Sequence, residues 1–239
     1  MNGATGIEVT DLAVERAGKR VIHGISFAVR EGGITALLGA NGAGKSSTVM
    51  ALAGVIPAVS GSISLDGRPL GGLPADRIRR SGIALVPEGH RVLGQMTVED
   101  NLLVAALERN TAARMDGLER VYRIFPELRE RRQQMASNLS GGQKQMVAMG
   151  QAFIARPRFM IVDELSLGLA PSVVKRLGEA LLVAARDGIG VLLIEQFANL
   201  ALGLAVRAMV MERGRIVYDG SSAELRENRH ILHGAYLAH

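Results

Sequence analysis

The sequence contains no cysteine and no tryptophan, and aromatic residues make up only 3% of it. Without cysteine, the chain forms no disulfide, has no thiolate nucleophile and offers no sulfur ligand to a metal. Few aromatic side chains argue against a partner such as single-stranded nucleic acid, whose bases stack on aromatic rings. The composition therefore excludes a disulfide scaffold and a cysteine enzyme, and it predicts that no nucleic acid is bound.

The sequence also has no long hydrophobic run. Its longest uncharged stretch, 46–65, contains serines, glycines and a proline that a bilayer-spanning helix would not carry. The opening residues MNGATGIEVT do not have a basic start followed by an apolar segment, so no secretion signal is expected. We expect a soluble protein that reaches a membrane only by docking onto another protein.

Glycine is abundant, with 29 residues among 239, and the hydrophobic fraction of 48% is enough for one globular unit with a buried core. The formal net charge of +5 suits an anionic ligand or an anionic surface and specifies neither. Many glycines indicate tight turns, which are common where a backbone approaches a ligand.

Apolar runs and alternating patterns predict a parallel α/β core. A helix is expected over 45–53, ending at Gly54, and another over 97–109, beginning with a capping box of Thr97 and Asp100. The charged segment that follows is patterned as further helices, which predicts a helical insertion. Strands are expected over 7–14, 25–29, 34–39, 61–67, 82–89, 158–164 and 190–196, with a final hairpin over 208–220.

The sequence GANGAGKSS begins at Gly39 and matches the phosphate-loop pattern G-x-x-x-x-G-K-[ST]. Its glycines let backbone N–H groups point inward, and the following helix adds partial positive charge at its N-terminus. Lys45 would contact the β- and γ-phosphates, and the Ser46 hydroxyl would bind Mg²⁺. The predicted ATP-binding residues are Gly39, Asn41, Gly42, Ala43, Gly44, Lys45, Ser46 and Ser47.

A second motif is FMIVDE at 159–164, an apolar run that predicts a buried strand ending at Asp163. Ligands of open α/β sheets bind at the carboxyl ends of the strands, so Asp163 would hold Mg²⁺ directly or through water. Glu164 would act on the attacking water, either as a general base or by orienting it. Beside the phosphate loop, this acidic pair predicts a nucleotide hydrolase.

A third motif, LSGGQ at 139–143, offers further anion-binding donors ahead of an expected helix. One phosphate loop holds one nucleotide, and this glycine pair lies beyond the helical insertion. We therefore expect two copies arranged head to tail. Ser140 and the N–H groups of Gly141 and Gly142 would face the γ-phosphate bound by the other copy, with Gln143 completing the signature.

In this order and spacing, the three motifs resemble the ATP-binding-cassette (ABC) ATPases over about residues 7–237. The resemblance implies an α/β fold: a P-loop NTPase (RecA-like) core with an antiparallel β subdomain and a helical insertion subdomain. It implies one ABC ATPase domain over 1–239, with the core about 1–88 and 157–239 and the helical subdomain about 89–156. The implied cofactors are ATP and Mg²⁺, and the implied place is the cytoplasmic side of the cell membrane. The implied partners are membrane-spanning permease subunits, a second ATPase subunit (a related chain or a second copy) and, indirectly, an external substrate-binding protein.

Three positions narrow the resemblance. Glu88 stands where most members have glutamine, Gln196 where most have histidine, and Ala170 where aspartate is more usual. Together with SLGLAP, which includes Ala170, they resemble one of the two ATPase subunits of branched-chain (hydrophobic) amino acid importers. ATPases of urea or amide importers and of exporters remain alternatives. A soluble ABC ATPase of ribosomes or DNA repair is disfavoured, because the chain has a single cassette and no heptad run.

The unusual residues have chemical consequences. Gln196 can bind the γ-phosphate or water but cannot accept a proton, which leaves Glu164 to handle the attacking water. Glu88 is anionic, so it would act on the magnesium side or as a coupling residue, unless it is a solvated loop carboxylate. We expect the segment 88–97 to dock a cytosolic helix of the membrane partner.

Adenine recognition is the least defined part of the expected site. ABC ATPases usually carry a stacking aromatic residue near the position of Ala17, and the sequence VERAGKR has none. The base would rest on Arg16, on Val21 or on no specific side chain. Leu165 replaces the usual proline after the acidic pair, which is expected to change the rigidity of that loop without loss of chemistry.

Overall fold

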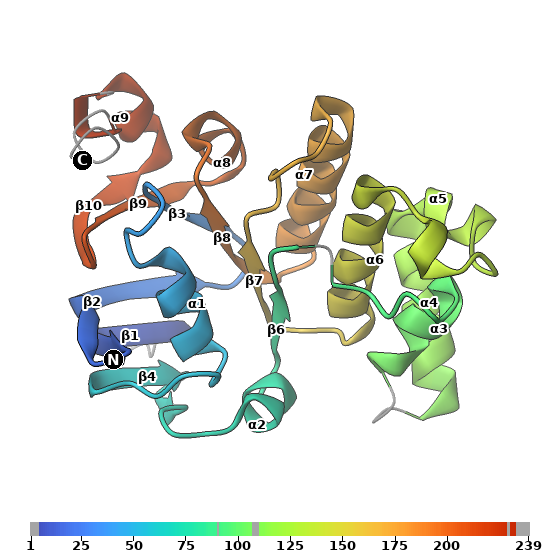
Figure 1. The fold of residues 1–239 in the computed structure, drawn as a ribbon, viewed down its shortest axis with the longest axis horizontal. Helices are drawn as coiled ribbons and strands as arrows, with labels where there is room; N and C mark the ends of the chain where they lie inside the picture. The colour runs from blue at the N-terminus through green and yellow to red at the C-terminus, as the bar shows by residue number, and fades with distance from the viewer. Residues whose placement is uncertain (1–4, 90, 107–109, 229, 233–239) are drawn as a thin grey trace.

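The structure, a computed structural model, describes residues 5–89, 91–106, 110–228 and 230–232. Figure 1 shows β-sheets and their covering helices on one side of the molecule and a group of helices, α3 to α6, on the other. His90 of the expected docking segment, residues 107–109 of an expected helix and the C-terminal sequence HGAYLAH at 233–239 lie outside the described residues.

The larger sheet has six strands in the order β10-β9-β3-β8-β7-β6. The strands β6, β7, β8, β3 and β9 run parallel, and β10 pairs antiparallel with β9. Nearly continuous apolar sequences such as ITALL form these strands, because helices or the second sheet cover both faces. The predicted parallel core and final hairpin are confirmed. The bounds are β3 Ile34–Leu38, β6 Ile83–Val86, β7 Phe159–Asp163, β8 Gly190–Glu195, β9 Arg207–Glu212 and β10 Arg215–Ser221.

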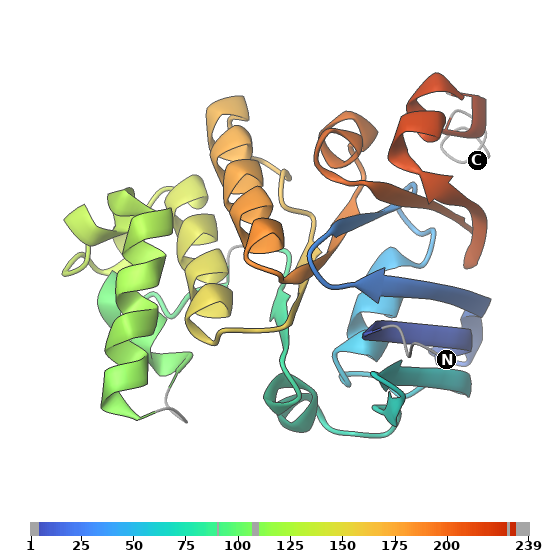
Figure 2. The same cartoon turned by 180° about the vertical axis from the view of Figure 1, so that it is seen from behind.

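Side chains of the central strands alternate between two hydrophobic cores, one on each face of the larger sheet. Val191 and Leu193 belong to the core that contains helix α6 (Gly141–Ile154). Leu192 belongs to the other core, which contains helix α1 (Lys45–Leu52). Helices α1 and α6 therefore pack on opposite faces of the sheet. In both views they lie apart, with strands of the larger sheet between them (Figures 1 and 2).

The smaller sheet is antiparallel and has the order β2-β1-β4-β5. Its alternating strands turn one face toward the core that contains α1, as a half-buried sheet does. The first two strands are longer than predicted, because they form one twisted hairpin with bulges. The bounds are β1 Gly6–Arg16, β2 Lys19–Arg30, β4 Ser60–Leu65 and β5 Arg68–Pro69.

The helices α3 to α6 form the predicted helical insertion, and we propose that about 89–156 is a subdomain of its own beside a core of about 1–88 and 157–239. The helix predicted at the phosphate loop is confirmed as α1. The other helices are α2 Ala75–Arg80, α3 Val98–Val104, α4 Thr111–Ile124, α5 Pro126–Glu130, α7 Pro171–Arg186, α8 Ala198–Leu204 and α9 Ser222–Glu227, and Ala136–Asn138 is a short 3-10 helix.

The predicted helix over 97–109 extends too far, because α3 ends at Val104. Thr97 is the N-cap as predicted, and its hydroxyl oxygen accepts the Asp100 N–H at 3.1 Å. The Asp100 carboxylate accepts the Thr97 hydroxyl at 2.6 Å, in place of the backbone N–H that a capping box would use. The pattern located the start of the helix better than its end.

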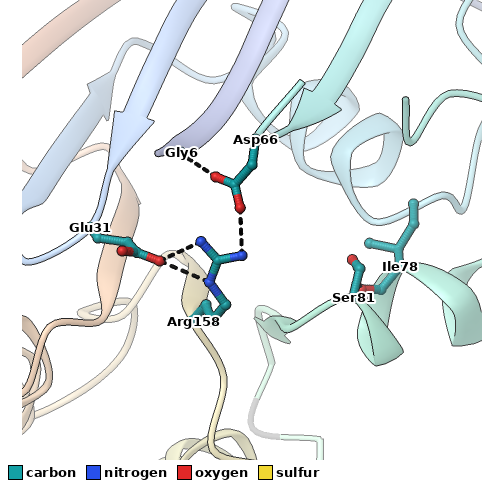
Figure 3. Close-up of polar contacts among 6 residues, drawn as sticks. All are labelled: Gly6, Glu31, Asp66, Ile78, Ser81 and Arg158. Atoms are coloured by element: carbon teal, nitrogen blue, oxygen red, sulfur yellow. Dashed lines mark hydrogen bonds and ion pairs between the residues drawn. The ribbon is translucent and has the colours of Figure 1, made fainter. Parts of the chain in front are cut away.

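Arg158 ties three segments together at the edge where the parallel strands begin (Figure 3). Its guanidinium donates to Glu31 at 2.6 and 2.8 Å and to Asp66 at 2.6 Å. Asp66 also accepts the Gly6 N–H at 2.8 Å, and the hydrogen bond from Arg158 holds the pKa of Asp66 below its ordinary value. This cluster joins the smaller sheet to the start of β7, at the opposite end of that strand from Asp163.

Candidate nucleotide-binding site

The phosphate loop connects β3 to α1 at the carboxyl edge of the larger sheet. Gly44 precedes α1 with φ 112°, and a Cβ there would lie 3.1 Å from the Val21 carbonyl oxygen and 3.2 Å from the Met211 sulfur. Only glycine suits this position. The β9–β10 turn supports the loop from another side, because the Gly214 N–H donates to the Ala43 carbonyl at 2.7 Å. The sequence motif predicted the loop but not these two supports.

Lys45 is the first residue of α1, and only 4% of it is exposed. Its Nζ donates to the carbonyl oxygens of Gly39 at 2.9 Å and Ala40 at 3.2 Å, and it lies 3.7 Å from Glu164 Oε1. The ammonium is therefore held inside the loop, where a terminal phosphate would compete for it. Among the other predicted loop residues, Asn41, Gly42 and Ser46 are exposed, and Ser47 is buried.

Asp163 is the last residue of β7 and is 7% exposed. Burial raises the pKa of its carboxyl to about 6, the negative charges of Glu164 and Glu88 add to this, and Lys45 opposes it. Within the described part of the chain, its buried Oδ1 has no hydrogen-bond partner. An unpaired buried carboxylate oxygen is what a divalent cation would satisfy, so the site fits Mg²⁺.

The fit to Mg²⁺ depends on the nucleotide. Over the residues that the structure describes, no cluster of three or more His, Asp or Glu side chains is placed to hold a metal ion alone. Mg²⁺ usually takes one or two protein ligands and fills its remaining positions with phosphate oxygens and water. Ser46, exposed at the start of α1, and Asp163 are candidate ligands in such a site, and the exposed Glu88 lies near enough for its charge to act on Asp163.

The predicted acidic and amide residues meet because their strands are neighbours. Glu88 follows β6, Glu164 follows β7 and Gln196 follows β8, and the order β8-β7-β6 brings all three to one edge. Glu164 has φ 48°, a conformation that surrounding contacts must hold, and its N–H donates to the Ile194 carbonyl at 3.0 Å. Glu88 is exposed, and its charge reaches Asp163.

Glu195 was missed in the sequence, although it directly precedes Gln196. It is 1% exposed, and its carboxylate accepts the Ser166 N–H at 3.1 Å and the Ser166 hydroxyl at 2.9 Å. A charged residue at the end of the apolar run GVLLI was the available signal, since a buried carboxylate needs donors. Its partner could not be found without the pairing of β7 and β8.

The LSGGQ sequence forms the beginning of α6. The Ser140 oxygen accepts the Gln143 N–H at 3.3 Å, and the Gln143 side chain accepts the Ser140 N–H at 3.0 Å, a complete capping box. Gly142 packs against α7, where a Cβ would lie 2.7 Å from a methyl group of Val173. Ser140 and Gly141 are exposed. A helix N-terminus with exposed donors can accept an anion, but α6 and α1 lie on opposite faces of the sheet.

We expect Asp163→Asn to stabilise the nucleotide-free protein at about pH 7.5. The pKa of Asp163 rises from its ordinary 3.8 to about 6 on folding, so the folded protein binds this proton more tightly than the unfolded chain. Ionisation of Asp163 therefore lowers the stability as the pH rises from about 4 to about 6, and asparagine removes that charge. The expected gain is about 3 kcal/mol at pH 7.5 and close to none at about pH 4. Urea unfolding at both pH values measures it, and equal or lower stability at pH 7.5 would contradict the assigned burial.

Comparison with known proteins agrees with the resemblance to ABC ATPases. The sequence profile of the ABC transporter family matches residues 22–166. The chain is 43% identical to the high-affinity branched-chain amino acid transport ATP-binding protein BraG of Pseudomonas aeruginosa, covering 91% of this chain and 93% of BraG. It is 31% identical to the lipopolysaccharide export system ATP-binding protein LptB of Escherichia coli, covering 92% of each chain. A solved ATP-binding subunit of an ABC transporter superposes with a TM-score of 0.82 at 30% identity, over 98% of this chain and 97% of that one.

Proposed function

Since this chain belongs to the ABC transporter family and is an ATPase coupled to transport, we propose that it powers the import of branched-chain (hydrophobic) amino acids. The main support for this substrate class is sequence identity. It is 43% to the branched-chain amino acid transport protein BraG and 31% to the lipopolysaccharide export protein LptB. Glu88, Gln196 and the sequence SLGLAP, on which the resemblance to these importers rests, support the same choice. A urea or amide importer is the alternative cargo class.

In the proposed site, the loop Gly39–Ser47 holds the phosphates, and Lys45 leaves its carbonyl partners for the β- and γ-phosphates. Ser46 and Asp163 hold Mg²⁺, which neutralises phosphate charge when it is bound. Glu164 orients the attacking water or accepts its proton, and the Gln196 amide binds the γ-phosphate. Glu88 lies on the magnesium side.

A second subunit completes the proposed site. Helix α6 packs on the face opposite to α1 and begins with the signature residues Ser140, Gly141, Gly142 and Gln143. We therefore expect that one chain does not bring these residues to its own phosphate loop. A head-to-tail pair would place the Ser140 hydroxyl and the helix N-terminus of one subunit against the γ-phosphate held by the other. The pair consists of two copies of this chain or of this chain with a related ATPase.

We propose that the segment 88–97 contacts a membrane-spanning permease. Among the described residues, no helix is both long and apolar enough to cross a bilayer. Leu93 in this segment is 49% exposed, and the buried Asn101 amide fixes it by accepting the Leu93 N–H at 2.7 Å and donating to its carbonyl at 2.9 Å. The Gly94 carbonyl accepts the Ser137 N–H at 3.0 Å, so the segment is joined to the chain that leads into Ser140.

We propose that the ATPase lies peripherally on the cytoplasmic side of the membrane, bound to the permease. A substrate-binding protein on the other side would deliver the amino acid. Movement of the docked permease helix would reach Ser140 through the hydrogen bonds between the segments around 94 and 137. In this way, the pairing of two ATPase subunits on ATP binding would be mechanically coupled to the permease.

Uptake by cells tests the cargo directly. In cells that lack this chain, uptake of labelled leucine is expected to fall, and the wild-type chain is expected to restore it. Lys45→Ala should not restore uptake, because the ammonium that binds the phosphates is lost. Urea uptake serves as the matched control and should stay constant. Unchanged leucine uptake together with a loss of urea uptake would contradict the proposal.

A second experiment identifies the partners of the chain: permease subunits are expected to co-purify with it from membranes.

A further inference from the structure

Glu195 is a buried carboxylate to which the hydrolysis scheme assigns no part. It ends β8, and both of its oxygens are engaged by one residue: Oε1 accepts the Ser166 N–H at 3.1 Å, and Oε2 accepts the Ser166 hydroxyl at 2.9 Å. Two-point contact by a carboxylate fixes both the position and the orientation of Ser166.

The contact lies between the two groups proposed to act on the γ-phosphate and the water. Ser166 follows Glu164 by two residues, and Gln196 directly follows Glu195. The Glu164 N–H donates to the Ile194 carbonyl at 3.0 Å, so this loop is fastened to β8 at two successive points. Hydrogen bonds to β8 therefore hold the backbone at Glu164 and at Ser166, and the φ of 48° at Glu164 needs such support.

We propose that Glu195 is a positioning residue for ATP hydrolysis. Through Ser166 it holds the backbone after Glu164, and this keeps the Glu164 carboxylate at a constant distance from the Gln196 amide. Glu195 itself touches neither phosphate nor the attacking water. The inference rests on the role proposed for Glu164, because that is the group whose position Glu195 maintains.

A purely structural role makes a different prediction. A carboxylate that only stabilised the fold would lower stability when removed and would leave the turnover of each folded molecule unchanged. A positioning role lowers kcat at saturating Mg-ATP while nucleotide affinity stays constant, because Lys45 and the loop Gly39–Ser47 are untouched. Misplacement of a reacting group by about 1 Å can reduce a rate by about 10²-fold.

Four variants test the proposal in the full-length chain, alone and with its co-purified membrane partners. Glu195→Ala is expected to lower kcat at least about 10-fold, with the dissociation constant for ATP within about 2-fold of wild type. Glu195→Gln should recover most of the rate, because its amide oxygen can accept the Ser166 N–H while its amide group donates to the Ser166 hydroxyl oxygen. Ser166→Ala should be intermediate, and the double alanine variant should be no slower than Glu195→Ala, since the contact is already lost.

The matched control is Asp66→Ala, which removes a carboxylate that also joins two segments, but at the opposite edge of the sheet (Figure 3). It should lower the melting temperature and leave kcat per folded molecule unchanged. Wild-type kcat in Glu195→Ala, or strictly multiplicative losses in the double variant, would overturn the proposal. If Glu195→Ala does not fold, Ser166→Ala decides, and a wild-type kcat there also overturns it.

Glu164→Gln, measured in parallel, separates this inference from the proposed site. If Glu164→Gln hydrolyses ATP normally, the role of Glu164 is wrong and the positioning role is lost with it. If Glu164→Gln is inactive while Glu195→Ala keeps the full rate, only the positioning role is wrong. If both lose turnover and both still bind ATP, the two assignments stand together.

Discussion

Glu164→Gln is expected to bind Mg-ATP normally and to lose nearly all turnover, a fall of at least about 10²-fold in kcat. The amide retains the size of the carboxylate and can still contact water, but it cannot accept a proton. The other described groups at this edge have other assignments: Gln196 is an amide, and Asp163 and Glu88 lie on the magnesium side. The Glu195 carboxylate is held by Ser166. Because Glu164 lies 3.7 Å from Lys45, loss of its charge also leaves the ammonium freer to bind phosphate.

Phosphate release at saturating Mg-ATP, with nucleotide affinity measured in the same preparation, provides the test. Glu179→Gln is a suitable control, because it makes the same chemical change on the exposed surface of α7. That variant should hydrolyse ATP at the wild-type rate. A Glu164→Gln rate within a few-fold of the control would show that another group handles the water.

Ser140→Asp is expected to abolish ATP-driven pairing and to reduce hydrolysis at least about 10²-fold, without weakening the binding of ATP to a single chain. Aspartate is as good an N-cap as serine, so α6 should remain intact. In the pair, its carboxylate would face the γ-phosphate of the other subunit. Two negative charges about 4 Å apart repel by about 4 kcal/mol at an effective dielectric constant of about 20.

Ser140→Asn is the matched control, since asparagine also caps a helix and carries no charge. It should keep most of the pairing that Ser140→Asp loses, and both variants should melt at the wild-type temperature. Light scattering in Mg-ATP reports the pairing. Equal pairing by the aspartate and asparagine variants would mean that no phosphate approaches the start of α6.

The parts of the site that could be predicted from the sequence are local ones. The phosphate loop is a continuous strand, loop and helix, so its position follows from nine consecutive residues, and the roles of those residues stay predictions. Asp163 was placed correctly because an apolar run ends there. The contact of Ser166 with Glu195 and the support of Ala43 by Gly214 were not predictable, because each depends on which strands are neighbours in the sheet.

The position of LSGGQ relative to the phosphate loop also depends on packing that the sequence does not reveal. Its sequence indicates a helix N-terminus suited to an anion, and the complete capping box of Ser140 and Gln143 agrees with that. Whether it could reach the phosphate loop of its own chain is decided by packing. The alternation of buried side chains along β8 puts α6 and α1 against different faces of one sheet. The number of residues between the phosphate loop and LSGGQ only suggested that the two motifs lie apart.

Disulfide crosslinking tests the shared nucleotide site most directly, because the natural chain contains no cysteine. One Glu164→Gln chain carries Asn41→Cys and another carries Ser140→Cys, with the related ATPase used as counterpart if the working pair is mixed. We expect a covalent dimer of the two different chains in Mg-ATP and none in ADP. Absence of that dimer from chains shown to be saturated with Mg-ATP and joined to their counterpart would contradict a nucleotide held between two subunits.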